Sequence, residues 1–245
     1  MATTVDCLRI AIEETARYEG APSTTPYRIS TDTHDLPIQT ANFGPNVQHL
    51  DRSDELRGVE GGPEMLVETY EPGGSLAIRG YVNSLTWLLH CAGFTGTVTA
   101  GDGVITDPDA ATIPTGAYRW VFTKRTGLSA KTMQMLLNYT THGVFAKGQG
   151  VGVSSLAMNG DGAVTAELMG LVYANTADPN ITPAYDSASI PPPRRGDLTV
   201  TWLGGSGTTD DFSFTIANPL VRRRTFTLAT PSYFPDVLEQ GDEKV

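Results

Sequence analysis

The sequence predicts an all-β domain, a β-sandwich or barrel with one flanking α-helix and long loop arms. Three observations lead to this prediction: a hairpin pattern between residues 151 and 170, about ten short strand-like runs against a single helical one, and the abundance of turn-forming residues, with 26 glycines and 16 prolines among 245 residues. Sandwiches and barrels of this length are common as single units, so we expect one domain spanning residues 1–245.

The hairpin is the clearest local signal. Its turn reads Asn159-Gly160-Asp161-Gly162, and Asn-Gly and Asp-Gly supply the positive φ angles that tight hairpin turns require. Alternation on both sides predicts an antiparallel ribbon with one buried and one wet face. In the first run Val151, Val153 and Ser155 face opposite to Gly152, Ser154 and Leu156, and in the second Val164, Ala166 and Leu168 face opposite to Thr165, Glu167 and Met169.

The N-terminal third combines one strand-like run with a long polar stretch. Residues 7–14 alternate loosely and predict a strand, with a short helix as the alternative. Residues 18–63 contain five prolines and only short apolar runs, so we expect an irregular N-terminal arm. A loop of that length in a compact domain is usually functional or ordered by a partner.

The next stretch predicts two strands and the one confident helix. Residues 65–70 and 75–81 read as strands joined by a turn at residues 71–74. Asn83 or Ser84 is the expected cap of a helix over residues 85–92, which ends at Gly93. Leu85, Leu88 and Leu89 share one helical face, which we expect to lie against the core.

The remaining chain alternates strands with turns. The expected strands lie at residues 94–99, 117–124, 131–139, 197–203, 212–217 and 225–229. Residues 175–195 contain three consecutive prolines and predict an extended loop. We expect the polar residues 236–245 to be frayed.

Composition excludes several classes of function. The formal net charge of −10 argues against a protein that grips nucleic acid by neutralising phosphates, which requires a lysine and arginine excess. The N-terminus lacks the pattern of a secretory signal, and the longest apolar run, Leu85–Ala92, is too short to span a membrane. Two cysteines, Cys7 and Cys91, offer no disulfide framework and are expected to be small buried thiols.

No motif predicts catalysis, a cofactor or a metal. The glycines at 148, 150 and 152 open a strand-like run, whereas a nucleotide-binding loop opens a helix. Ser154 lacks the context of a nucleophile elbow, and His34, Asp35, His49 and Asp51 match no ligand spacing. His90 lies on the apolar helix and is expected to be a structural residue. The basic cluster Arg222, Arg223 and Arg224 is predicted to pair with carboxylates of a neighbouring subunit rather than with nucleic acid.

Four segments together resemble the major tail tube proteins of long-tailed, siphovirus-type bacteriophages, over most of residues 5–235. They are LRIAIEE at 8–14 with Ala21-Pro22 soon after, GSLAIRGY running into NSLTWLLHCAGF, the aromatic strand AYRWVFTK, and the hairpin SSLAMNGDGAVTAELMG.

The resemblance implies a structural virion protein without enzymatic activity. Six subunits would join their sheets into a ring, and rings would stack through long loops to form the tail tube, the conduit for genome ejection. The implied partners are further copies of the chain, the terminator, distal tail and tape measure proteins, and double-stranded DNA in transit, with no membrane partner. Assembly would take place in the cytoplasm of the host bacterium.

Within such a tube, we expect Glu167 to face the channel, where an acidic wall keeps the duplex mobile. Two alternatives remain within the virion, a tail terminator ring and a β-sandwich decoration module that binds a glycan or receptor. The second requires clustered exposed aromatics, and only Trp87, Trp120 and Trp202 are available as tryptophans.

Overall fold

The computed structural model confirms the all-β class, with one helix among the residues that it describes. It describes residues 7–13, 29–50, 66–100, 118–125, 130–139, 144–176, 200–202, 205–207, 213–223 and 237–241. The elements within them are β1 (Cys7–Glu13), β2 (Ile29–Leu36), β3 (Ile38–Gly44), β4 (Val47–Leu50), β5 (Leu66–Tyr70), β6 (Gly73–Arg79), α1 (Val82–Cys91), β7 (Phe94–Ala100), β8 (Tyr118–Lys124), β9 (Met133–Tyr139), β10 (Val144–Asn159), β11 (Ala163–Met169), β12 (Val172–Asn175), β13 (Val200–Trp202), β14 (Gly205–Gly207), β15 (Ser213–Ala217), β16 (Leu220–Arg223) and β17 (Val237–Gln240).

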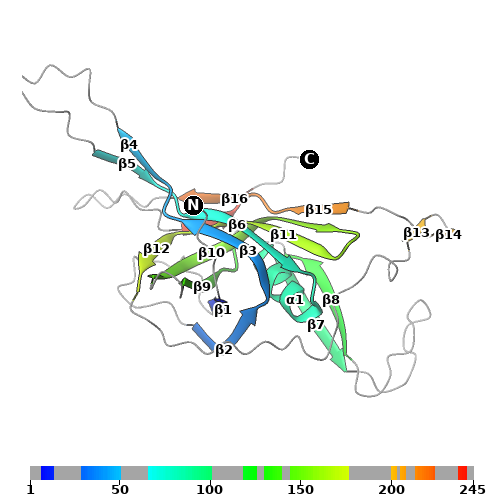
Figure 1. Ribbon diagram of the computed structural model, residues 1–245. Helices are drawn as coiled ribbons and strands as arrows, with labels where there is room; N and C mark the ends of the chain where they lie inside the picture. The colour runs from blue at the N-terminus through cyan, green and yellow to red at the C-terminus, as the bar shows by residue number, and fades with distance from the viewer. Residues whose placement is uncertain are drawn as a thin grey trace, which may run out of the picture.

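The long strand β10 belongs to both halves of the main nine-stranded sheet (Figure 1). Its first part pairs with β9 and β12, giving a half with the order β2-β1-β9-β10-β12. Its second part pairs with β11 and β15, giving a half with the order β3-β6-β11-β10-β15. The chain crosses between the halves at Pro37, which separates β2 from β3.

A β-bulge marks the point where β10 passes from one half to the other. The register against β9 shifts between Gly148 and Val151, and Gly150 has φ +61°, a conformation that favours glycine. The buried carboxylate of Glu13, at the end of β1, accepts a hydrogen bond from the Gly150 N–H at 3.1 Å and another from the Thr132 hydroxyl at 2.5 Å. Glu13 therefore fixes the bulge from β1, two strands away in the same half.

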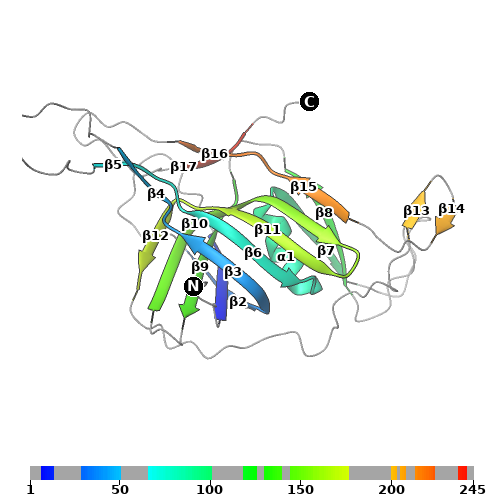
Figure 2. The same ribbon diagram turned by 45° about the horizontal axis from the view of Figure 1, so that its top comes forward.

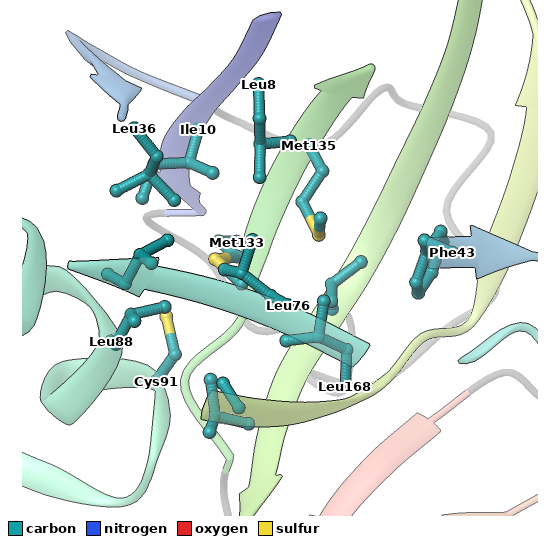
Figure 3. Packing of buried hydrophobic residues seen from close by; sticks show 14 of the residues in the cluster. Leu8, Ile10, Leu36, Phe43, Leu76, Leu88, Cys91, Met133, Met135 and Leu168 are labelled. Carbon is teal, nitrogen blue, oxygen red and sulfur yellow. The ribbon is translucent and has the colours of Figure 1, made fainter. Parts of the chain in front are cut away.

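Both halves contribute side chains to one hydrophobic core (Figure 3). Most of the fully buried side chains come from β1 and β9 in one half and from β6, β10 and β11 in the other; among them are Leu8, Ile10, Met133, Met135, Leu76, Ile78, Leu156 and Val164. Alternation on β11 is as expected, since Val164, Ala166 and Leu168 are buried while Thr165 and Glu167 are exposed.

Helix α1 lies against the same core through the predicted leucine face. Leu88 is fully buried, and Leu85 and Leu89 pack against the core at its margin. The helix ends as predicted: Ala92 donates back to the Leu88 carbonyl at 2.8 Å, and Gly93 follows with φ +91°. Its expected cap was wrong, because the helix begins at Val82 after Tyr81, without a side-chain cap. With ten residues, this only helix in the described ranges is too short to cross a membrane.

The expectation of an irregular segment at residues 18–63 was wrong between residues 29 and 50, where the chain forms β2, β3 and β4. Proline was a misleading signal here, because Pro37 and Pro45 stand between strands and interrupt none of them. The remaining residues of that segment, and residues 177–195 of the second expected loop, lie outside the described residues.

Three further local predictions were wrong. Residues 71–74 do not form the predicted turn, because Gly73 and Gly74 already belong to β6. β5 pairs with β4, while β6 pairs with β3 and β11. Leu156 faces the core together with Val153, because a second irregularity between Val153 and Ser155 changes the alternation. The terminal stretch is not frayed at Val237–Gln240, which pairs with β16 as β17.

Candidate functional surfaces

The outer face of the β3-β6-β11-β10-β15 half is a regular array of small, mostly polar side chains. The strand registers align them in two rows across all five strands. One row is Thr40, Ala77, Thr165, Ala157 and Thr215, and the next is Asn42, Ser75, Glu167, Ser155 and Ala217. None of the ten is buried. We call these ten residues the polar face; with four strand spacings it is about 19 Å wide.

Glu167 is the one ionisable residue of the polar face and stands at its centre, on the middle strand. Its neighbours across the strands are Ser75 and Ser155, so no cation of the two rows faces it. Near the β10–β11 turn, Asp161 and Arg79 are exposed with opposite charges. The structure therefore places the predicted channel residue on an exposed sheet, in largely neutral hydroxyl and amide surroundings rather than a densely acidic patch.

Both edges of this half are open within the part of the chain that the structure describes. β3 pairs only with β6 at one edge, and β15 pairs only with β10 at the other. An open edge presents unpaired backbone N–H and C=O groups, which are a ready template for another strand. The two edges lie on different strands, so pairing between them would be heterologous.

An arm extends from one of these edges. Strands β4 and β5 continue the ribbon of β3 and β6, because the pair Gly44–Gly73 is followed by the pair Val47–Tyr70. Figures 1 and 2 show β4 and β5 projecting away from the rest of the sheet. Val47, Gln48 and His49 are exposed on this arm. A two-stranded ribbon is marginally stable by itself in water, so the arm depends on its root or on a partner.

We call the point where β3 and β6 pass into β4 and β5 the arm root (residues 43–46 and 70–73). It is tightly packed around Phe43, which is 2% exposed. A Cβ at Gly170 would lie 2.6 Å from Phe43 Cζ, and one at Gly148 would lie 2.8 Å from its Cε1. Beside it, the Tyr70 hydroxyl donates to the Tyr173 carbonyl at 2.5 Å and accepts from the Tyr173 N–H at 3.0 Å. Gly148, one of the three closely spaced glycines at 148, 150 and 152, thus leaves the space that the Phe43 ring occupies.

Arg222 and Arg223 of the predicted basic cluster bind different partners. Arg222 donates to the Gly170 carbonyl at 3.0 Å and to the Pro72 carbonyl at 2.5 Å, at the arm root. Arg223 pairs with Glu239 on the adjacent strand β17. Arg224 lies outside the described residues. The contacts of Arg222 and Arg223 lie within the chain, and the intersubunit role predicted for the three arginines stays a prediction.

His34 and Asp35 occupy structural positions. His34 is buried, stacks on Trp87 with ring centroids 5.7 Å apart, and its Nε2 lies 3.4 Å from the Ser84 hydroxyl. Asp35 forms a bidentate pair with Arg9 at 2.6 and 2.8 Å. His49 lies on the arm in β4, whereas His34 lies in β2. The described residues contain no cluster suited to a metal ion.

Burial makes the groups around the end of α1 poor candidates for acid–base or nucleophilic chemistry. Burial, reinforced by the positive charges of Arg125 and Lys131, lowers the pKa of His90 to about 4, so this imidazole is neutral at pH 7. Burial, together with the charge of Glu13, raises the pKa of the Cys91 thiol to about 12. A thiol with such a pKa is not a nucleophile near neutral pH. The backbone of Cys7 is part of β1 and pairs with β9, and its side chain lies outside the described residues.

Comparison of the chain with models of known protein families gives no match, and comparison with curated proteins gives none either. The geometry of the polar face, its two edges and the arm therefore carries the functional argument.

The packing at the arm root predicts that Gly170→Ala is destabilising. The added methyl would overlap Phe43, and overpacking of this kind costs about 1–3 kcal/mol. Urea denaturation followed by tryptophan fluorescence measures the change. Gly44→Ala is the matched control, since a Cβ there would meet nothing within 4 Å. Equal midpoints for the two variants would show that Phe43 is not held as described.

Proposed function

We propose that this chain is a tail tube subunit, a structural protein whose copies form hexameric rings that stack into the conduit for genome ejection. The observation that carries the proposal is a five-stranded sheet with a polar outer face, open at both edges, with an arm leaving one edge. The resemblance of four sequence segments to tail tube proteins supports the same function.

Ring closure follows from the edges. The β15 edge of one copy would pair with the β3 edge of the next, so that the sheet continues from copy to copy. Each contact then joins two different edges, one from each copy. Such heterologous pairing gives a closed ring when the rotation closes, and closure removes the exposed edges. A curved, continuous sheet of this kind has one face turned inward, and the polar face is suited to that side.

The polar face is suited to a channel wall because it offers DNA little to bind. Tight binding to DNA depends on lysine and arginine side chains that release counterions from the phosphates, and the ten residues include neither. Arg79, exposed in the next row of the same side of β6, is the nearest cation along that strand. Short hydroxyl, amide and methyl groups leave the surface smooth and hydrated. In this arrangement Glu167 contributes repulsion at the centre of the wall.

The arm provides contact along the axis. It extends beyond the sheet edge, and its exposed ribbon would be stabilised by packing on the adjacent ring. The alternative of a glycan-binding module requires clustered exposed aromatics, and among the side chains that the structure describes the large exposed hydrophobic ones are Val47, Val121 and Val221, none of them aromatic. The side chains of Trp120 and Trp202 lie outside that description. A terminator would share the ring but not the repeated stacking.

Electron microscopy of the purified protein tests the proposal. We expect tubes or stacked rings for the intact chain. A variant in which residues 48–69 are replaced by an Asn-Gly turn should keep the sheet and form single rings, since it retains both edges but loses the arm. Dispersed monomers of the intact chain under all assembly conditions would contradict the proposal, and single rings of the intact chain would favour a terminator.

Replacing Glu167 tests the role of the polar face. In virions carrying Glu167→Lys, DNA ejection should slow on the order of 10-fold at low salt, because each ring gains cations that bind phosphates. Glu167→Gln should have a smaller effect. Thr123→Lys, on the exposed side of β8, adds one positive charge away from this sheet and is the control. Unchanged ejection in Glu167→Lys virions with normal tubes would show that this face does not line the channel.

A further inference from the structure

Arg222 connects three segments that are far apart in the sequence. Its Nε donates to the Gly170 carbonyl, between β11 and β12, and its Nη2 donates to the Pro72 carbonyl, between β5 and β6. Its Nη1 lies 3.7 Å from Glu71 Oε2. The arginine side chain is 16% exposed, and burial lowers its pKa while Glu71 opposes that shift. The guanidinium therefore spans the point where the arm leaves the sheet.

The backbone at this point is held from two sides. The Pro72 carbonyl also accepts the Gly170 N–H at 2.8 Å, so it is shared between β11's end and Arg222. A Cβ at Gly73 would lie 3.1 Å from the Leu168 carbonyl and 3.4 Å from Arg222 Nη2. The backbone at Gly73 thus packs between the sheet and the guanidinium, which leaves the arm little space to change its angle to the sheet.

The β16–β17 ribbon, on which Arg222 lies, is anchored separately from the arm. Leu220 and Leu238 of the β16–β17 ribbon pack over Gly152, where a Cβ would lie 2.8 Å from each of them. With Ala130 and Leu171 they form a second, smaller hydrophobic cluster. Because Gly152 faces away from the main core residues Val151 and Val153, the ribbon covers the opposite side of β10.

We propose that Arg222 is a positioning residue for the arm: the β16–β17 ribbon, through Arg222, fixes the direction in which β4 and β5 leave the sheet. The proposal rests on the proposed function in one respect, that the arm makes the axial contact. An arm held at one angle before assembly loses less conformational freedom on docking, which strengthens stacking without any new contact. A long planar fork is needed to reach two carbonyls and a carboxylate together, and lysine lacks it.

Hydrogen exchange of the unassembled subunit tests the positioning role directly. In Arg222→Gln and Arg222→Lys, the amides of Glu71 and Gly170 should exchange at least 10-fold faster, since their bonds to Asn46 and Pro72 lie at the arm root. The amides of Val164 and Ala166, in the middle of β11, should be unchanged. Arg223→Gln is the control, because it removes the same charge from the same strand and its ion pair is with Glu239 on β17 rather than with the arm root.

Tube assembly gives the second readout. The two Arg222 variants should still close rings, and the protein concentration needed for stacking should rise about 10-fold relative to Arg223→Gln. Unchanged exchange at Glu71 and Gly170, or an equal increase at every amide in both variants, would overturn the positioning role. If exchange at the root increases as expected while the intact chain forms no rings or tubes, the positioning role stands and the proposed function fails.

Discussion

The hydrogen bond between Glu13 and the bulge in β10 is the constraint on which the rest of the fold depends. Strand β10 belongs to both halves of the sheet, and its change of direction requires an extra residue at Gly150 whose N–H lies away from the strand ladder. A buried N–H without a partner is costly, as is a buried carboxylate. Here the two satisfy each other, with Thr132 as a further donor.

The surfaces follow from this bend. The buried side of both halves meets in one core, which leaves the outer side of the β3-β6-β11-β10-β15 half exposed and regular. The same region of β10 supplies Gly148 under Phe43 and Gly152 under Leu220 and Leu238. The arm root and the ribbon that holds it are therefore built on neighbouring residues of a single strand, and a displacement of the bulge would affect both.

The sequence was informative where local patterns decide the structure and misleading where distant pairing does. The hairpin turn at residues 159–162, the leucine face of α1 and the exposure of Glu167 follow from alternation and turn chemistry. Strands β2, β3 and β4 are polar and lack such alternation; they are strands because β1, β6 and β5 pair with them. Arg222 donates to carbonyls that lie 52 and 150 residues away in the sequence, and no local pattern encodes these contacts. The packing of Phe43 against Gly148 and Gly170 also depends on residues far away in the sequence.

In the proposed ring, subunits join through the outer edges of β3 and β15. Hydrogen exchange of backbone amides, measured on assembled and unassembled protein, tests it most directly. We expect the outward-facing amides of both edge strands to gain strong protection on assembly, while those of the central strand β11 change little. Assembled particles in which the amides of β3 and β15 exchange as fast as in the free subunit would contradict it.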